Sequence, residues 1–158
     1  MIGRVALILG LGYVAAVLQQ AVAPRWVILG VSPDFFLAFL TPIAMFSTAR
    51  PSVITGFYFG LLQGALPTAN IAHYVLSRSV AAFCVSASNG LRLNPSVWIA
   101  AATTAVATLL AQLLWMFMAA PPNIGAFLGD TIGSAMYNGV IAMPMYALLR
   151  KVLGPAPS

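Results

Sequence analysis

Apolar stretches of helical length follow one another along the chain, separated by short segments marked by Pro, Gly, Asn or Arg. Only 6% of the residues are charged and 61% are hydrophobic, whereas a soluble domain uses roughly a quarter charged residues to cover its surface. The chain therefore cannot build a water-compatible shell, and lipid must be the solvent for most of its surface. We expect an all-α, polytopic membrane protein.

Six transmembrane helices fit this division, because each crossing takes roughly 20 apolar residues. In a single transmembrane domain over residues 1–158, the predicted helices span 2–23, 33–48, 52–66, 71–88, 96–119 and 125–151. Ser32 is placed to cap the second helix, with Pro33 at its first helical position. The second and third helices are short, so one re-entrant pair is an alternative to two crossings.

The distribution of basic residues predicts the orientation of this bundle, because cytoplasmic loops and flanks collect Lys and Arg. Six crossings place both termini on one side of the membrane, together with the second-to-third and fourth-to-fifth connections. The basic residues of that side are Arg4, Arg50, Arg92, Arg150 and Lys151. The opposite side carries only Arg25 outside a helix. We therefore expect both termini to be cytoplasmic.

Glycines recur at every fourth residue in two of the predicted helices, the third and the sixth. The two sets are Gly56, Gly60 and Gly64, and Gly125, Gly129 and Gly133. Residues four apart stack on one helix face, so each set makes a groove where another backbone can approach closely. Two interpretations are open: packing within the bundle, or a binding face for a helix of another membrane protein.

Four ionisable residues are expected near the outer ends of their helices: Asp34, His73, Arg78 and Asp130. An Arg within a membrane span is costly unless it is paired or reaches water, so we predict that Arg78 pairs with Asp34 or Asp130. The pair could fix helix register, form a polar site for a partner or lipid headgroup, or relay protons or ions. Transporters usually place relay residues nearer the midplane, which disfavours the last role.

The sequence offers little material for catalysis, so we expect a non-enzymatic protein without a metal or cofactor. His73 has no nucleophile at motif spacing, and no phosphate-binding Gly-Lys motif or metal-ligand spacing is present. The lone Cys84 lies in an apolar run and is interpreted as a core residue. The basic residues are scattered, which argues against nucleic-acid binding. Interhelical hydrogen bonds are expected from Gln19, Gln20, Gln63, Gln112 and Asn138.

Several segments resemble MreD, the small membrane component of the bacterial rod-shape machinery. They are 33–37 (PDFFL), 56–61 (GFYFGL) and 136–144 (MYNGVIAMP), followed by a basic end at 150–151. The order of elements from the second to the fourth helix also agrees, and the resemblance covers most of the chain. Many family members carry an Asp where this chain has Gly64, so any partner contact made by that Asp must differ here.

The resemblance implies a non-enzymatic, multi-pass scaffold of the bacterial inner membrane, in contact with membrane lipid. Such a protein would bind MreC in a larger complex with the cytoskeletal MreB, the glycosyltransferase RodA and a penicillin-binding transpeptidase. It also implies a six-helix fold similar to the substrate-binding subunits of energy-coupling-factor vitamin transporters. A subunit of that kind is the alternative function, and it would need an outer ligand cavity lined by the four ionisable residues named above. A membrane enzyme is disfavoured, because the sequence contains no catalytic constellation.

Overall fold

The computed structural model describes residues 2–66, 70–91 and 96–153, and these residues are almost entirely helical. The α-helices are α1 (Ile2–Ala21), α2 (Phe35–Met45), α3 (Ala49–Gly64), α4 (Ile71–Ser88), α5 (Val97–Met118) and α6 (Ile124–Leu153). Short 3-10 turns, Ala23–Arg25 and Asn89–Leu91, follow α1 and α4. The expected all-helical fold is confirmed for the described residues, while Arg92 lies outside them.

Three helical segments are long and apolar enough to cross a membrane: Gly3–Arg25, Val97–Met118 and Ile124–Leu153. Helix α2 has only 11 residues, which makes it about 16 Å long. A hydrocarbon core is roughly 30 Å thick, so α2 alone does not span it. The length and composition of α1, α5 and α6 are those of a membrane protein.

The outer surface of the bundle is apolar along whole helices. Exposed large side chains recur at every fourth residue on α1 and again on α6. They are Val5, Leu9, Tyr13 and Val17, and Leu128, Ile132, Met136 and Val140. A helix at the surface of a water-soluble bundle keeps this outward stripe polar. The exterior therefore suits lipid rather than water.

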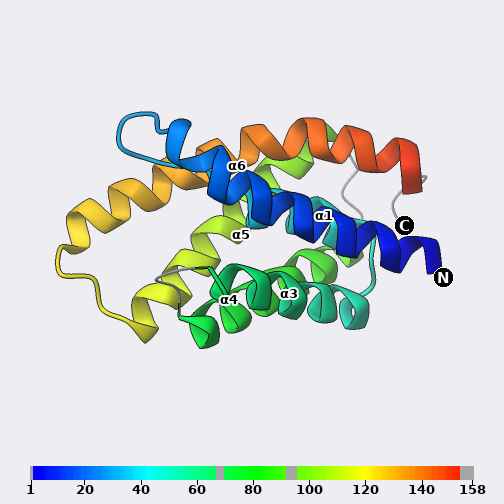
Figure 1. Cartoon of the computed structure of the whole chain (residues 1–158), viewed down its shortest axis with the longest axis horizontal. Helices are drawn as coiled ribbons and strands as arrows, with labels where there is room; N and C mark the ends of the chain where they lie inside the picture. Colours follow the sequence, from blue (N-terminus) through cyan, green and yellow to red (C-terminus); the bar gives the residue numbers. More distant parts are fainter. Residues whose placement is uncertain (1, 67–69, 92–95, 154–158) are drawn as a thin grey trace.

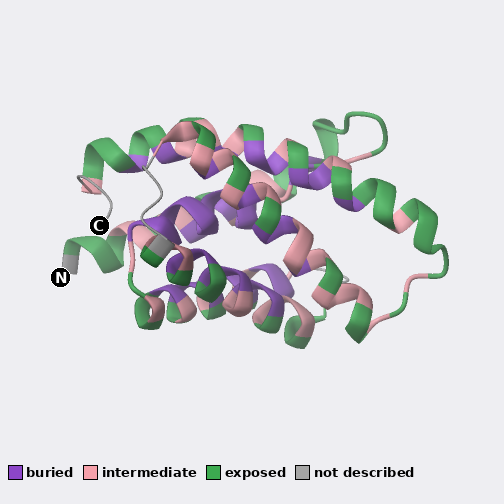
Figure 2. Cartoon of the chain, turned by 180° about the vertical axis from the view of Figure 1, so that it is seen from behind, coloured by how far each residue is buried: buried purple, intermediate pink, exposed green. Residues whose placement is uncertain are grey.

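Helix α2 lies at the centre of the molecule, and all of its residues are buried. Each of the other five α-helices contacts it. Figure 2 shows the buried ribbon gathered in the middle of the bundle, with exposed segments on the outer helices. Because α2 is covered on every side, its sequence is apolar all round instead of amphipathic. Edge-to-face packing of Phe36 on Phe59, with ring centroids 6.1 Å apart, attaches α2 to α3.

The first glycine set packs α3 against α4. A Cβ atom added at Gly56, Gly60 or Gly64 would lie 2.5–2.6 Å from backbone atoms of α4 between Ile71 and Arg78. Such distances are far shorter than ordinary van der Waals contact, so only glycine permits this approach. This set therefore packs within the bundle, and α4 occupies the groove that a helix of another protein would need.

The second glycine set does not act as a unit. A Cβ atom at Gly133 would come within 2.8 Å of the Val31 side chain, so this glycine receives the α1–α2 connection. Among the described residues, nothing lies within 4 Å of that position at Gly129, and Gly125 meets the Asn123 side chain at 3.5 Å. In Figure 1 the end of α5 and the start of α6 form the left-hand edge of the molecule. The face with Gly125 and Gly129 is therefore open.

Two local predictions are wrong. Helix α2 starts at Phe35 instead of residue 33, and its N-cap is Asp34 instead of Ser32. Asp34 has an extended backbone, with φ −103° and ψ 92°, and its carboxylate accepts a hydrogen bond from the backbone of Leu37. This is the geometry of an N-cap. Cys84, expected in the core, is exposed on α4.

The start of α1 and the end of α6 lie at the same end of the bundle. Figure 1 shows the starts of α1 and α3 and the end of α6 at one end of the molecule, with the α1–α2 connection at the other. Arg4, Arg50, Arg150 and Lys151 belong to the first end, and Arg25 belongs to the second. The basic residues that the structure describes are therefore gathered mainly at one end.

Replacing Gly60 by Ala tests the α3–α4 packing. The new Cβ would lie 2.5 Å from the Val75 Cα atom, and a backbone cannot move aside as a flexible side chain does. We expect Gly60→Ala to lower the free energy of unfolding in mixed micelles by about 1–3 kcal/mol, the usual effect of overpacking. Gly129→Ala is the matched control, because its Cβ would meet open space. Equal stability of the two variants would contradict the packing.

Candidate functional site

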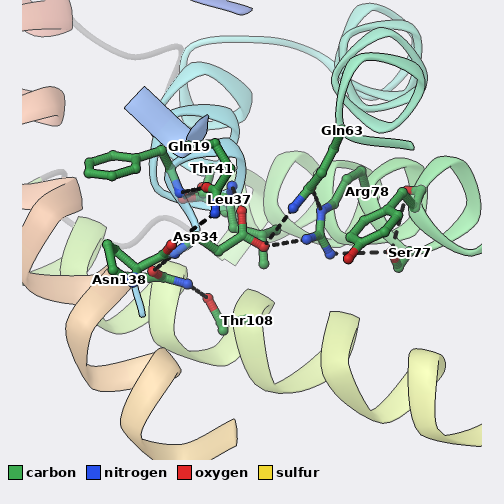
Figure 3. A network of polar contacts seen from close by, with 12 residues as sticks. Gln19, Asp34, Leu37, Thr41, Gln63, Ser77, Arg78, Thr108 and Asn138 are labelled. Atoms are coloured by element: carbon green, nitrogen blue, oxygen red, sulfur yellow. Dashed lines mark hydrogen bonds and ion pairs between the residues drawn. The ribbon is translucent and has the colours of Figure 1, made fainter. Parts of the chain in front are cut away.

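An ion pair joins the start of α2 to the middle of α4. The guanidinium of Arg78 contacts the Asp34 carboxylate through Nη2 and Oδ2 (Figure 3). Arg78 is 4% exposed, so its charge is held inside the bundle. The prediction that Arg78 pairs with Asp34 or Asp130 is confirmed for Asp34. A buried charge is tolerated when it is paired and hydrogen-bonded, and this pair meets both conditions.

Gln63 of α3 completes a triangle with the two charges. Its Oε1 accepts a 2.8 Å hydrogen bond from Arg78 Nε, and its Nε2 donates to Asp34 Oδ2 at 3.3 Å. Arg78 Nη1 also donates to the Ser77 hydroxyl at 3.3 Å, and the guanidinium carbon lies 5.1 Å from the centroid of the Tyr74 ring. All three nitrogens of the guanidinium therefore bond to the protein, and Tyr74 adds a cation–π contact.

The same site satisfies the backbone at the start of α2. The first N–H groups of any helix have no partner within the helix. Here Asp34 N–H donates to Asn138 Oδ1 at 2.8 Å, and Phe35 N–H donates to Gln19 Oε1 at 2.9 Å. Leu37 N–H donates to the Asp34 carboxylate at 3.1 Å. That carboxylate thus serves both as cap and as counter-ion, and its negative charge suits the positive end of the helix dipole.

Hydrogen bonds continue from this site through α5. The Asn138 side chain donates to the Thr108 hydroxyl at 3.2 Å, and that hydroxyl donates to the Thr104 carbonyl at 2.8 Å. The Thr104 hydroxyl in turn lies 2.6 Å from that of Thr41. Every α-helix contributes a side chain to this polar network: Gln19 (α1), Thr41 (α2), Gln63 (α3), Arg78 (α4), Thr108 (α5) and Asn138 (α6).

The opposite end of α2 is also held by side chains from other elements. Arg4 of α1 donates to the Phe46 carbonyl at 2.8 Å. Asn89, which follows α4, donates to the carbonyls of Met45 and Ser47 at 3.3 Å each. A buried helix needs such partners for its last carbonyl groups. In the sequence Arg4 is only a topology signal, and Asn89 lies just beyond the predicted helix 71–88.

Asp130 and His73 do not join the ion pair. Asp130 is exposed, and within the described residues it makes no side-chain hydrogen bond. Asn138 lies on the buried face of the same helix, whereas Asp130 does not. His73 packs edge-on against Trp115, with ring centroids 6.2 Å apart, and Trp115 stacks on Phe127 at 6.0 Å. The four residues were grouped because they lie at similar depths along their helices. Depth does not determine which way a side chain points around the helix axis, so the predicted group of four reduces to one pair.

The network is suited to holding helices together. The expectation of interhelical hydrogen bonds is confirmed for Gln19, Gln63 and Asn138. Thr41 and Thr104 were missed, because a threonine in an apolar helix carries no sequence signal that separates a bond across helices from one to its own backbone. Within the described residues, no group of His, Cys, Asp and Glu is arranged to hold a metal ion.

Comparisons with protein-family models, with curated proteins and with solved structures find no match for this chain. The resemblance to MreD therefore rests on the three short segments identified in the sequence.

Replacing Asn138 by Leu tests the contribution of the network to stability. The substitution leaves the Asp34 N–H, at the half-buried start of α2, without its acceptor, and a polar group left unpaired away from water costs about 1–3 kcal/mol. We expect a loss of that size in the free energy of unfolding, measured by denaturant titration in mixed micelles. Met136→Leu, on the exposed face of the same helix, is the control and should change stability by less than about 0.5 kcal/mol. Equal effects would rule out the network as a stabilising feature.

Proposed function

We propose that the chain is a non-enzymatic, multi-pass scaffold of the bacterial inner membrane that serves the cell-shape and peptidoglycan elongation machinery. In this proposal the chain crosses the membrane six times with both termini in the cytoplasm, and the crossing that contains the short α2 is completed by the non-helical residues on either side of it. The scaffold binds MreC and, through the larger complex, RodA, a penicillin-binding transpeptidase and MreB. The resemblance to MreD supplies the identity of these partners, and the geometry of the bundle supports the type of function.

The observation that carries the proposal is the internal use of the buried charges. Arg78 and Asp34 bond to each other and to Gln63 within the bundle, and they hold three helices in register. A vitamin-binding subunit would need these same groups to face a ligand. Asp130, a third residue of that hypothetical site, is exposed elsewhere. The arrangement therefore favours a scaffold over a transporter subunit.

The segments that resemble MreD come together in the fold. Segment 33–37 forms the start of α2, and segment 136–144 supplies Asn138, which accepts the hydrogen bond of Asp34 N–H. Segment 56–61 contains glycines that pack on α4, and its Phe59 packs on Phe36 of the first segment. Residues far apart in sequence thus meet around one buried helix end. The meeting of these three segments at one place supports the proposal that the resemblance extends to the fold.

The open face of α6 is the proposed contact for the partner's transmembrane helix. Gly125 and Gly129 lie on it without bundle contacts that would block a neighbour, and the exposed Leu128 and Ile132 lie beside them. In lipid, helices associate mainly through close van der Waals packing, which small residues permit. A single helix of MreC is therefore expected to pack here.

Co-purification tests the proposal. The tagged chain is isolated from its bacterial host in mild detergent, and co-purifying proteins and small molecules are identified by mass spectrometry. We expect MreC and cell-wall synthases with the wild type, and several-fold less MreC with Gly129→Leu, because a bulky side chain prevents close approach. Gly10→Leu is the matched control, since Gly10 is another exposed glycine with nothing within 4 Å of an added Cβ.

The other outcomes of this experiment are also decisive. Wild-type recovery of MreC with Gly129→Leu would show that the α6 face is not the contact. Recovery of an ATPase-coupled membrane subunit, or of a stoichiometric vitamin, would overturn the scaffold in favour of the transporter alternative.

A further inference from the structure

A narrow crevice lies between α1, the end of α2 and the end of α6. Its walls are apolar apart from Arg4 and Ser47, and the remaining lining residues are Leu7, Ile8, Leu11, Ile43, Leu149 and Leu153. Figure 1 shows the start of α1 and the end of α6 at the same end of the molecule. The crevice therefore lies at the end that carries most of the basic residues.

Arg4 lines this crevice, and Arg150 lies near it at the same end of α6. Arg4 is exposed, and one of its terminal nitrogens holds the Phe46 carbonyl at 2.8 Å. A guanidinium has five N–H donors, so Arg4 keeps donors for a second acceptor outside the bundle. Arg150 is exposed and directly follows Leu149, one of the lining residues. Positive charge at the mouth of an apolar crevice is complementary to an anionic amphiphile.

We propose that this crevice is a binding site for an anionic phospholipid of the surrounding bilayer. One acyl chain lies along the mouth of the crevice, between α1 and α6, in contact with the half-buried Leu7, Leu11 and Leu153. The phosphate group accepts hydrogen bonds from Arg4, and Arg150 lies beside it. The planar guanidinium matches the geometry of a phosphate and binds it through two parallel bonds.

The helices that form the crevice favour lipid over a soluble anion or a partner helix. Helices α1 and α6 are both long enough to span a membrane, and their outer faces are apolar, so acyl chains are the ordinary neighbours of this crevice. Basic residues near the ends of membrane helices attract anionic headgroups. The inference rests on the membrane location of the chain and is independent of its role as a scaffold.

Native mass spectrometry of the purified full chain measures the charge requirement. Dioleoyl-phosphatidylglycerol is titrated against dioleoyl-phosphatidylethanolamine, which has the same acyl chains and no net charge. We expect preferential retention of phosphatidylglycerol, and about a fivefold weaker affinity for it in Arg150→Gln, as expected for the loss of one basic residue near a membrane surface. Arg150→Gln leaves the Arg4–Phe46 bond intact, so it does not disturb the end of α2.

Arg25→Gln is the matched control, because Arg25 is an exposed arginine at the opposite end of the bundle. It should retain wild-type affinity. Equal weakening by Arg25→Gln and Arg150→Gln would mean non-specific attraction of charge and would overturn the site. Equal retention of the two lipids by the wild type would overturn it as well.

Photo-crosslinking locates the acyl chain. Phosphatidylglycerol with a diazirine in one chain is incorporated into nanodiscs with the wild-type protein, and crosslinked peptides are mapped. We expect crosslinks concentrated at residues 7–11 and 149–153, with competition by unlabelled phosphatidylglycerol but not by phosphatidylethanolamine. Crosslinks spread evenly over other exposed apolar positions, such as Val106 and Leu113 of α5, would contradict the proposal.

Discussion

A short helix buried among other helices has unpaired backbone groups at both ends, and within a membrane these groups need partners in the protein. Asp34 resolves the first of these ends: its carboxylate caps α2 and balances the buried charge of Arg78. Asn138 and Gln19 satisfy two further N–H groups, while Arg4 and Asn89 hold carbonyl groups at the other end. The packing of the other five α-helices around α2 depends on these contacts.

This use of polar groups shapes what the molecule can do. The buried ionisable pair holds helices together, so the faces left for interaction are apolar and lie on the outside. Binding of other helices or lipids in the membrane then depends on the shape of these outer faces and on charge at the helix ends. The open glycine face of α6 suits close packing of another helix, and the crevice beside Arg4 suits a lipid with an anionic headgroup. Both proposals follow from a rigid centre and an apolar exterior.

The sequence predicts the order of the helices well, because breakers and scarce charges leave few ways to divide the chain. It also predicts a carboxylate partner for Arg78, since an unpaired Arg in lipid is too costly. It does not predict which way a side chain faces around its helix, and so Asp130 and Cys84 were misplaced. Nor does it distinguish a glycine that receives another helix, such as Gly60, from one that stays open, such as Gly129. That difference depends on tertiary packing.

The most direct test of the central role of the Asp34–Arg78 pair is a double-mutant cycle in mixed micelles. Arg78→Met removes the cation, and Asp34→Asn removes the anion while keeping an oxygen that can cap α2. Each single variant should lose about 3–5 kcal/mol of unfolding free energy, because it leaves one buried charge unpaired. The double variant should lose less than the sum of the two by at least about 1 kcal/mol. Additive losses would show that the pair does not hold the bundle together.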